Sequence, residues 1–241
     1  MKAKSGSEKA LEYIESHSRD RKIRKTGPCV TVSRQSGAGS SIVDERLKNI
    51  LEQNQGDEFG EWAIFDKNLI EKIMEDHNIP ERLTRLFSSE KQSAITNMVN
   101  ELLGLMPSTK TILHQTAETI LQLGITGNVI IVGRAGNVIT AHLKNAFHVR
   151  LVAPLEDRII RIQDYYKIDR KQAVDWIKKE DKSREDYYSK NYHRNIDNPL
   201  LYHLTVNTHL LSYEEAASVI AHAVMKKFPA MFLKPEAALS Q

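Results

Sequence analysis

Residues 33–41 read Ser-Arg-Gln-Ser-Gly-Ala-Gly-Ser-Ser, a composition typical of a loop that binds phosphate groups. Gly37 and Gly39 allow a turn in which backbone N–H groups point at anionic oxygens. A helix that begins after the loop adds the positive end of its dipole. The hydroxyl of Ser40 or Ser41 could bind Mg²⁺. The predicted chemistry is binding of a nucleoside triphosphate and transfer of a phosphoryl group.

The loop lacks the lysine that reaches the β- and γ-phosphates in the common form of this motif. That lysine would stand at position 40, where this chain has Ser40. Arg34, at the start of the loop, is the nearest replacement cation, because a guanidinium binds phosphate as a fork. A short glycine–serine turn in any α/β protein would have a similar composition, so both interpretations stay open at this point.

Two charged residues follow predicted strands. Asp66 ends the stretch GEWAIFD, either as the N-cap of the next helix or as a ligand for an acceptor or for metal-bound water. Arg134 follows NVIIVG in a Gly-Arg-Ala-Gly turn, which resembles a turn opened to receive a phosphate. The alternative for Arg134 is a structural cation at a strand end.

The segment 181–194 is dense in charged and aromatic side chains. A solvated helix with ion pairs four residues apart would have this pattern. A mobile lid whose arginines close over transferring phosphates would have it too. Arg158 and Arg161, on the preceding predicted helix, could face the same cleft or the exterior.

Five strands alternate with helices along the chain and predict an α/β fold with a doubly wound parallel sheet. The strands are expected near residues 29–33, 60–66, 128–133, 146–154 and 201–208, and the region 81–123 is expected to be helical. In such sheets, ligands bind outside the carboxyl ends of the strands. The glycine-rich loop, Asp66 and Arg134 each follow a strand, so they are expected to converge at one edge of the sheet.

The composition is that of an ordinary globular protein: 241 residues, 41% hydrophobic and 27% charged, with a formal net charge of +3. This near balance argues against nucleic acid as a partner, although residues 19–25 form a basic patch. No apolar run is long enough for a membrane helix. Cys29 is the single cysteine, which excludes an internal disulfide and suits a reducing cytoplasm. The oligomeric state stays open.

Six stretches in this order resemble the cytidylate kinase-like family, relatives of bacterial cytidylate kinase among the nucleoside-monophosphate (NMP) kinases. They are VTVSRQSGAGSS, FDKNLIEKI, NVIIVGRAGNVI, HVRLVAPLEDRIIRI, DKSREDYYSKNY and NPLLYHLTVNTHLLSYEEAASVI. The resemblance covers residues 29–228 and implies a P-loop kinase core, with a helical acceptor-binding insertion at 81–123 and a lid at 181–198. An N-terminal helix with a basic linker (1–28) and a loosely ordered tail (229–241) lie outside it.

The resemblance implies ATP and Mg²⁺ as cofactors and nucleotides as substrates. The residues that would bind the ATP phosphates are Ser33, Gln35, Ser36, Gly37, Ala38, Gly39, Ser40 and Ser41, with Ser41 as the metal ligand. The implied catalytic residues are Arg34, Arg134 and Arg184, and the implied substrate-binding residues are Asp66, Arg134 and Asp181.

The loop departs from bona fide cytidylate kinases, which have Ser-Gly-Ala-Gly-Lys-Gly where this chain has Ser36-Gly37-Ala38-Gly39-Ser40-Ser41. Relatives in the cytidylate kinase-like family commonly lack this lysine and keep a Ser-Arg-Gln start, which this chain matches. The leading hypothesis is transfer of a phosphoryl group from Mg-ATP to a small acceptor such as CMP. The alternatives are a non-catalytic nucleotide-binding or regulatory protein, and a nucleic-acid-binding module that uses the basic patch.

Overall fold

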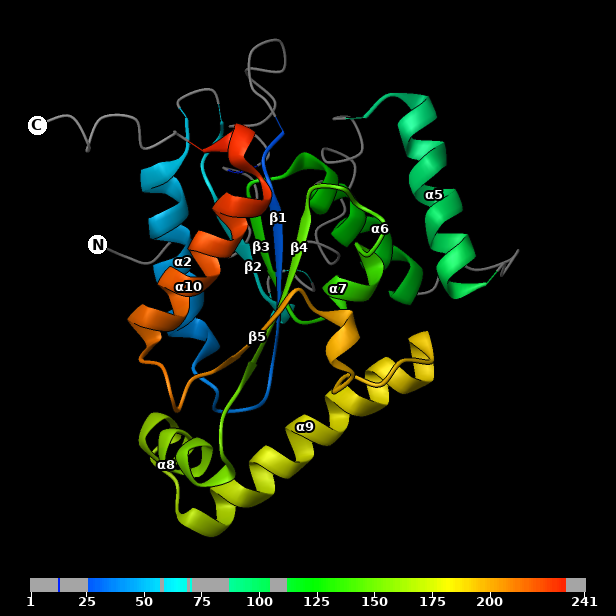
Figure 1. The fold of residues 1–241 in the computed structure, drawn as a ribbon. Helices are drawn as coiled ribbons and strands as arrows, with labels where there is room; N and C mark the ends of the chain where they lie inside the picture. The colour runs from blue at the N-terminus through cyan, green and yellow to red at the C-terminus, as the bar shows by residue number, and fades with distance from the viewer. Residues whose placement is uncertain are drawn as a thin grey trace, which may run out of the picture.

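The computed structural model describes residue 13 and residues 26–56, 59–68, 70, 87–104 and 112–232. Five parallel strands form one sheet in the order β2-β3-β1-β4-β5 (Figure 1). They are β1 (Cys29–Arg34), β2 (Ala63–Phe65), β3 (Val129–Val132), β4 (Ala146–Val152) and β5 (Leu204–Asn207). The predicted α/β fold with a parallel sheet is confirmed.

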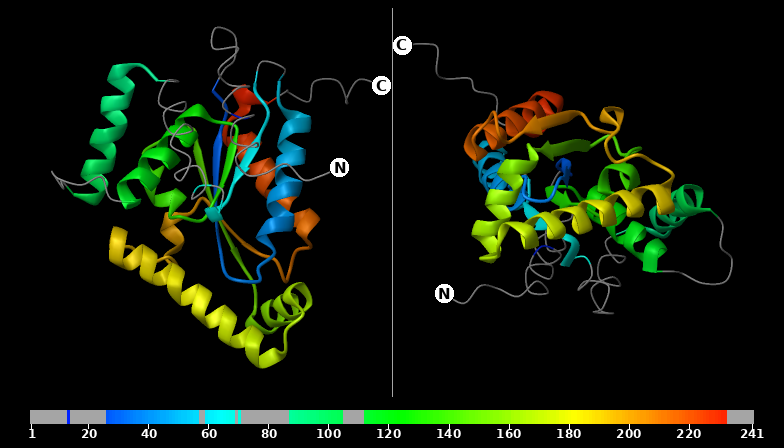
Figure 2. Two further views of the ribbon diagram at one scale, coloured as in Figure 1. Left: turned by 180° about the vertical axis from the view of Figure 1, so that it is seen from behind. Right: turned by 90° about the horizontal axis from the view of Figure 1, so that it is seen from below.

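Helices cover both faces of the sheet. On one face lie α2 (Ser40–Asn54) and α10 (Tyr213–Lys227), while α6 (Ile112–Thr126) and the short α7 (Gly136–Ile139) lie on the other (Figures 1 and 2). Helix α5 (Ser89–Leu103) packs outside α6. The described part of the predicted helical region 81–123 is therefore helical, although α6 continues to Thr126 and two stretches of this region lie outside the described residues.

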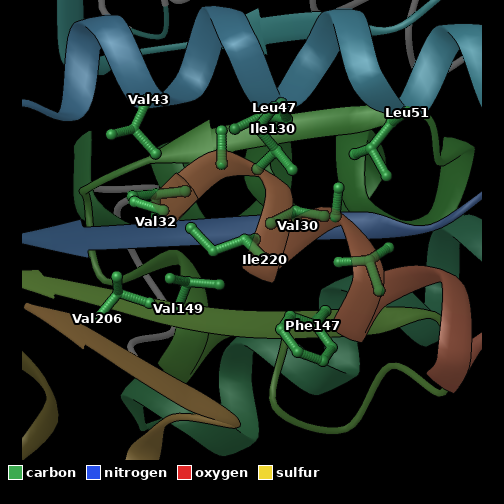
Figure 3. Packing of buried hydrophobic residues seen from close by; sticks show 14 of the residues in the cluster. Val30, Val32, Val43, Leu47, Leu51, Ile130, Phe147, Val149, Val206 and Ile220 are labelled. Atoms are coloured by element: carbon green, nitrogen blue, oxygen red, sulfur yellow. The ribbon is translucent and has the colours of Figure 1, made fainter. Parts of the chain in front are cut away.

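The strands at the centre of the sheet are buried on both faces, which explains why they read as continuous apolar runs. Val30 and Val32 of β1 point into the layer beneath α2 and α10, where they meet Leu47 and Ile220 (Figure 3). Cys29 faces the opposite layer and is completely buried. Burial raises the pKa of its thiol to about 12, so Cys29 is a packing residue and not a nucleophile.

Beyond the carboxyl ends of the strands lie α8 (Leu155–Tyr166) and the long α9 (Arg170–Tyr192) (Figure 1). Helix α9 begins at a capping box formed by Asp169 and Gln172, and it ends where His193 adopts a left-handed conformation with φ 52°. Residues 181–192 of the predicted lid are thus the second half of a continuous helix, because no helix-breaking residue separates them from Arg170.

The pattern Ser212-x-x-Glu215 predicts a capping box at the start of α10, and it is present, since the Ser212 hydroxyl accepts from the Glu215 N–H and the Glu215 carboxylate accepts from the Ser212 N–H. The prediction of a loosely ordered tail is wrong for its first residues. Residues 229–231 form a short 3₁₀ helix (η2), and Phe232 is buried and bridges to Gln55. The reason is that Phe232 fills the end of the apolar layer beneath α2 and α10.

The remaining predictions lie mainly outside the described residues. They concern the N-terminal helix, the basic patch at 19–25, the helix expected after Asp66 beyond residue 70, and the tail from residue 233. Among the helices of the described ranges, none combines the length and the apolar character needed to cross a membrane.

Candidate active site

The glycine-rich loop turns sharply between β1 and α2. Gly37 and Gly39 have φ values of 78° and 81°, a conformation that favours glycine. A Cβ on Gly37 would lie 2.8 Å from the backbone oxygen of Arg158, and one on Gly39 would overlap the ring of Tyr213. Gly39 is the N-cap of α2 and has no side chain to accept from the N–H groups of Ser40 and Ser41, whereas the Ile42 and Val43 N–H groups donate to the Gly39 oxygen. The loop and helix end therefore fit a phosphate group.

The loop is held in place by contacts with β4 and with residues that follow β5. The Gln35 N–H donates to the Leu151 oxygen at 3.0 Å, and the Ala153 N–H donates to Gln35 Oε1 at 3.1 Å. Thr208 Oγ1 donates to the Ala38 oxygen at 3.0 Å, and Arg161 donates to Thr208 and to the Gly37 oxygen. The side chain of Gln35 thus serves to anchor the loop, and Arg161 faces the loop rather than the exterior.

The guanidinium of Arg34 reaches from the end of β1 to the end of β3. A Cβ on Gly133 would overlap Arg34 Nη1, so the close approach requires glycine there. Burial lowers the pKa of Arg34, and the charge of Arg184 lowers it further, while Asp44 and Asp66 raise it. Arg34 and Arg184 are therefore two like charges held close together at a partly desolvated site.

Residues from three strand ends and from α9 surround a cavity of about 370 Å³. The predicted site residues that line it are Ser33, Arg34, Asp66, Arg134 and Arg184. Among the described residues, the lining contains four cations, because Lys67 joins the three arginines, and two carboxylates, Asp66 and Glu180. The start of the loop, Asp66 and Arg134 thus meet at one edge of the sheet, whereas residues 35–41 of the loop are not among those that line the cavity. The described lining carries more positive than negative side chains.

Arg134 occupies an unusual backbone turn. Gly133, Arg134 and Ala135 have φ values of 85°, 51° and 53°, so two consecutive non-glycine residues are left-handed. Such residues are strained and persist where the surrounding structure determines them, often at functional sites. The guanidinium carbon of Arg134 lies 5.4 Å from the ring centroid of Tyr187, a cation–π distance.

Asp181 joins α9 to the loop. Its Oδ1 accepts a hydrogen bond from the Ser36 N–H at 2.8 Å and from Arg184 Nη1 at 3.0 Å. Its Oδ2 accepts from Arg158 Nη1 at 2.6 Å. Arg184 Nη1 also donates to Ser36 Oγ at 2.6 Å. Asp181, predicted to bind substrate, is thus hydrogen-bonded to the loop and to two arginines of the chain itself.

Ser40 and the buried Asp44 form a hydrogen-bonded pair that was not predicted from the sequence. Ser40 Oγ donates to Asp44 Oδ2 at 2.5 Å, and Asp44 is 2% exposed. Burial raises the pKa of Asp44 to about 7, while the Ser40 hydrogen bond and the Arg34 charge act to lower it. The signal was present in the sequence, because Asp44 lies among Val43, Leu47 and Leu51 on the apolar side of α2.

Ser33 and Ser41 have different surroundings. Ser33 is buried and accepts a hydrogen bond from Arg150 Nη1 at 2.9 Å, and Arg150 in turn pairs with Asp197. Ser41 is exposed in the first turn of α2.

The described residues hold no group of three or more His, Cys, Asp or Glu side chains suited to a metal ion.

A profile described as the cytidylate kinase-like family matches residues 29–210, about three quarters of the chain. The chain belongs to the cytidylate kinase-like family. The match spans β1, the loop, Arg134, α9 and β5, and so includes every described residue that lines the cavity. Family and fold together indicate a nucleotide-binding protein of the kinase type.

Two curated proteins are similar over parts of the chain. A cytidylate kinase from Thermoplasma acidophilum is 33% identical over 98 residues, which are 40% of this chain and 52% of that protein. A uronate isomerase from Corynebacterium glutamicum is 25% identical over 116 residues, 48% of this chain and 22% of that protein. This cytidylate kinase-like chain thus spans about half the length of the cytidylate kinase and about a fifth of the length of the uronate isomerase.

Solved structures resemble the fold. An uncharacterized protein from Eubacterium ventriosum superposes with a TM-score of 0.64 at 16% identity, covering 83% of this chain and 99% of that chain. A shikimate kinase from Acinetobacter baumannii in complex with shikimate gives a TM-score of 0.39 at 15% identity, covering 83% and 94%. The first likeness shows that the fold of this family member also occurs in that solved protein.

Proposed function

We propose that this protein transfers a phosphoryl group from Mg-ATP to a nucleoside monophosphate, such as CMP, with a loop that lacks lysine. Arg34 takes the role of the missing cation at the loop, while Arg134 and Arg184 neutralise charge on the acceptor and the transferring group. Asp66, at the end of β2, faces the acceptor. The relatives in the family and the cytidylate kinase of Thermoplasma acidophilum support nucleotides as substrates.

The observation that carries the proposal is the meeting of three arginines from three separate segments around one cavity. Arg34 ends β1, Arg134 follows β3 and Arg184 lies in α9, so the fold has to bring them together. Like charges repel one another, and burial already lowers the pKa of Arg34. A polyanionic ligand would remove this repulsion, and phosphoryl transfer depends mainly on positioning and on neutralisation of charge.

The loop fits the phosphates of ATP, because the left-handed glycines and the uncapped start of α2 leave N–H groups for anionic oxygens. Bound Mg²⁺ would neutralise charge on the β- and γ-phosphates. Ser41, in the first turn of α2, is the proposed protein ligand for this ion. Arg184 already donates to Ser36 Oγ, so its guanidinium lies directly beside the loop.

Product detection by phosphorus NMR tests the proposal. The purified protein is incubated with Mg-ATP and, separately, with CMP, dCMP, UMP, AMP or GMP. A nucleoside diphosphate formed from one of them, together with ADP, is expected. If no acceptor yields a diphosphate while Mg-ATP raises the melting temperature, the transfer proposal is wrong and a nucleotide-binding role takes its place.

That second candidate, a non-catalytic nucleotide-binding protein, has one observation in its favour. The position of the usual lysine is held by Ser40, whose hydroxyl is bonded to the buried carboxyl of Asp44. A hydroxyl held by a buried carboxyl therefore takes the position from which a cation would assist the leaving phosphate. Loss of one such cation typically lowers the rate by about 10²–10³-fold unless another replaces it.

A further inference from the structure

One face of α9 lines the cavity with both rings and charges. Trp176, Glu180, Ser183 and Tyr187 follow one another at spacings of four, three and four residues, so they share one face of the helix, together with Arg184. The helix runs across the carboxyl ends of the strands (Figures 1 and 2). A ligand that lies along this face meets an aromatic surface near one end and guanidinium groups near the other.

The aromatic end is fixed by the packing between α8 and α9. Trp176 is half-buried against an apolar cluster that includes Ile159, Ala173 and Ile177. Its ring centroid lies 5.1 Å from that of Tyr166, at an interplanar angle of 47°. Both residues line the cavity, and Tyr166 keeps 47% of its surface exposed. The two rings are therefore held in place and still present surface to a ligand.

The cationic end lies at the ends of β1 and β3. Arg184 is eight residues after Trp176, which corresponds to about 12 Å along the helix axis. This length is comparable to the span from the phosphate to the far edge of the base in a nucleoside monophosphate. The cavity lies over the ends of β1, β2 and β3, on the side of Asp66 and Arg134.

On the basis of the proposed function, we infer that Trp176 and Tyr166 form the stacking surface for the base of the acceptor nucleotide. The acceptor phosphate then lies toward Arg134 and Arg184. Every nucleobase has a flat face that stacks on aromatic rings. Among the described residues, the rings of Tyr166 and Trp176 line the cavity from the hairpin of α8 and α9, and this placement carries the assignment.

The chain contains only two tryptophans, which provides a direct measurement. Trp62 lies just before β2, at the amino end of that strand, and is buried with its indole N–H donating to Gln55 Oε1. In the Trp62→Phe protein, Trp176 is the single tryptophan. Its fluorescence is expected to change on addition of CMP or AMP, and to stay constant with ribose 5-phosphate or inorganic phosphate. Equal responses to CMP and ribose 5-phosphate, or no response to either, would overturn the inference.

Affinity measurements on the full chain provide the second test. Stacking of one base on an aromatic side chain accounts for about 5- to 150-fold in affinity. CMP should bind tighter than ribose 5-phosphate by this factor, and Trp176→Leu should remove the preference while leaving the affinity for ribose 5-phosphate unchanged. Tyr165→Leu is the matched control, because Tyr165 belongs to the same aromatic group, is 75% exposed and is not among the residues that line the cavity. A Trp176→Leu protein that keeps the preference overturns the inference.

These measurements are independent of turnover. Base-dependent binding without any diphosphate product would support the stacking surface and contradict phosphoryl transfer. Diphosphate formation with the same KM for CMP in the wild type and in Trp176→Leu would support transfer and overturn the stacking surface. If Trp176→Leu does not fold, the fluorescence of the Trp62→Phe protein decides alone.

Discussion

The carboxylate of Asp181 accepts a hydrogen bond from the backbone N–H of Ser36 at 2.8 Å, across 145 residues of sequence. The same carboxylate accepts from Arg158 of α8 and from Arg184 of α9. One internal anion thus ties the phosphate loop to two arginines. Charge-assisted hydrogen bonds of this kind are stronger than neutral ones and fix geometry. Asp181 is therefore best understood as a positioning residue, because its carboxylate already contacts three donors of the chain.

Replacing Asp181 with Asn is expected to lower kcat/KM by about 10²-fold, because Arg158 and Arg184 lose their shared counter-charge and move from the loop. Steady-state kinetics with Mg-ATP and the accepted nucleotide measure this, and calorimetric titration with ATP reports on binding separately. Asp186→Asn is the matched control on the same helix, since Asp186 pairs with the exposed Lys182 and Lys190. A tighter affinity for ATP in Asp181→Asn would show that the carboxylate competes with phosphate instead of positioning arginines.

The Arg34→Ala variant is expected to lose about 10²–10³-fold in the rate of transfer, with a melting temperature close to that of the wild type. The reason is that the proposed mechanism gives Arg34 the role of the absent lysine. Arg46→Ala serves as the control, because Arg46 is a half-exposed residue of α2 that pairs with Glu214. An unchanged rate in Arg34→Ala would remove Arg34 from the mechanism, whatever the effect at Arg46.

Arg134 allows stability and activity to be separated. Both Arg134→Ala and Arg134→Gly remove the guanidinium, so both should abolish transfer. Arg134 has a φ of 51°, and a left-handed conformation costs a non-glycine residue about 1–2 kcal/mol. The Gly variant should therefore be more stable than the Ala variant by about 1 kcal/mol, after the larger chain entropy of unfolded glycine is allowed for. Urea unfolding of the two proteins gives this difference directly. An Ala variant as stable as the Gly variant would mean that the turn is not strained.

Much of the fold follows from the sequence. The strands are continuous apolar runs because each central strand is buried on both faces, and the first residue after each strand falls at the same edge of a parallel sheet. The sequence alone therefore predicts that the loop, Asp66 and Arg134 lie at the same edge of the sheet. The order of the strands and the direction of the Arg34 side chain could not be predicted from the sequence. Both depend on contacts between segments about 100 residues apart.

The contacts that the sequence did not predict share a physical cause. Asp44 places a carboxyl group on an apolar helix face, and periodicity alone does not show whether such a residue is buried or lies at an edge. Asp181 was expected to bind substrate, but its hydrogen bond with the loop was not predicted, because only its packing distinguishes it from other acidic residues of α9 such as Asp186. Phe232 follows a proline and a stretch without periodicity, yet its ring fills a gap in the core.

The buried carboxyl of Asp44 predicts a characteristic dependence of stability on pH. Its pKa is raised from 3.8 to about 7 in the folded protein, mainly by burial. Between these values the folded state holds a proton that the unfolded state has released, so stability falls as pH rises from about 4 to 7 and is level above that range. His148 acts in the opposite direction, because burial lowers its pKa from 6.5 to about 4. The contribution of His148 to the free energy of unfolding therefore increases as pH rises from about 4 to 6.5.

Asp44→Asn isolates the carboxyl, because the amide oxygen can still accept from Ser40 Oγ and every other titrating group is unchanged. The free energy of unfolding of the variant, relative to the wild type, should increase by about 3 kcal/mol between pH 5 and pH 8, at 1.36 kcal/mol per pKa unit. Urea unfolding at pH 5, 6, 7 and 8 measures both proteins, and the contribution of His148 cancels in the difference. A difference that is constant with pH would show that Asp44 titrates near its ordinary value. The carboxyl would then be ionised beside the loop at neutral pH, which would strengthen the case for a binding protein over a kinase.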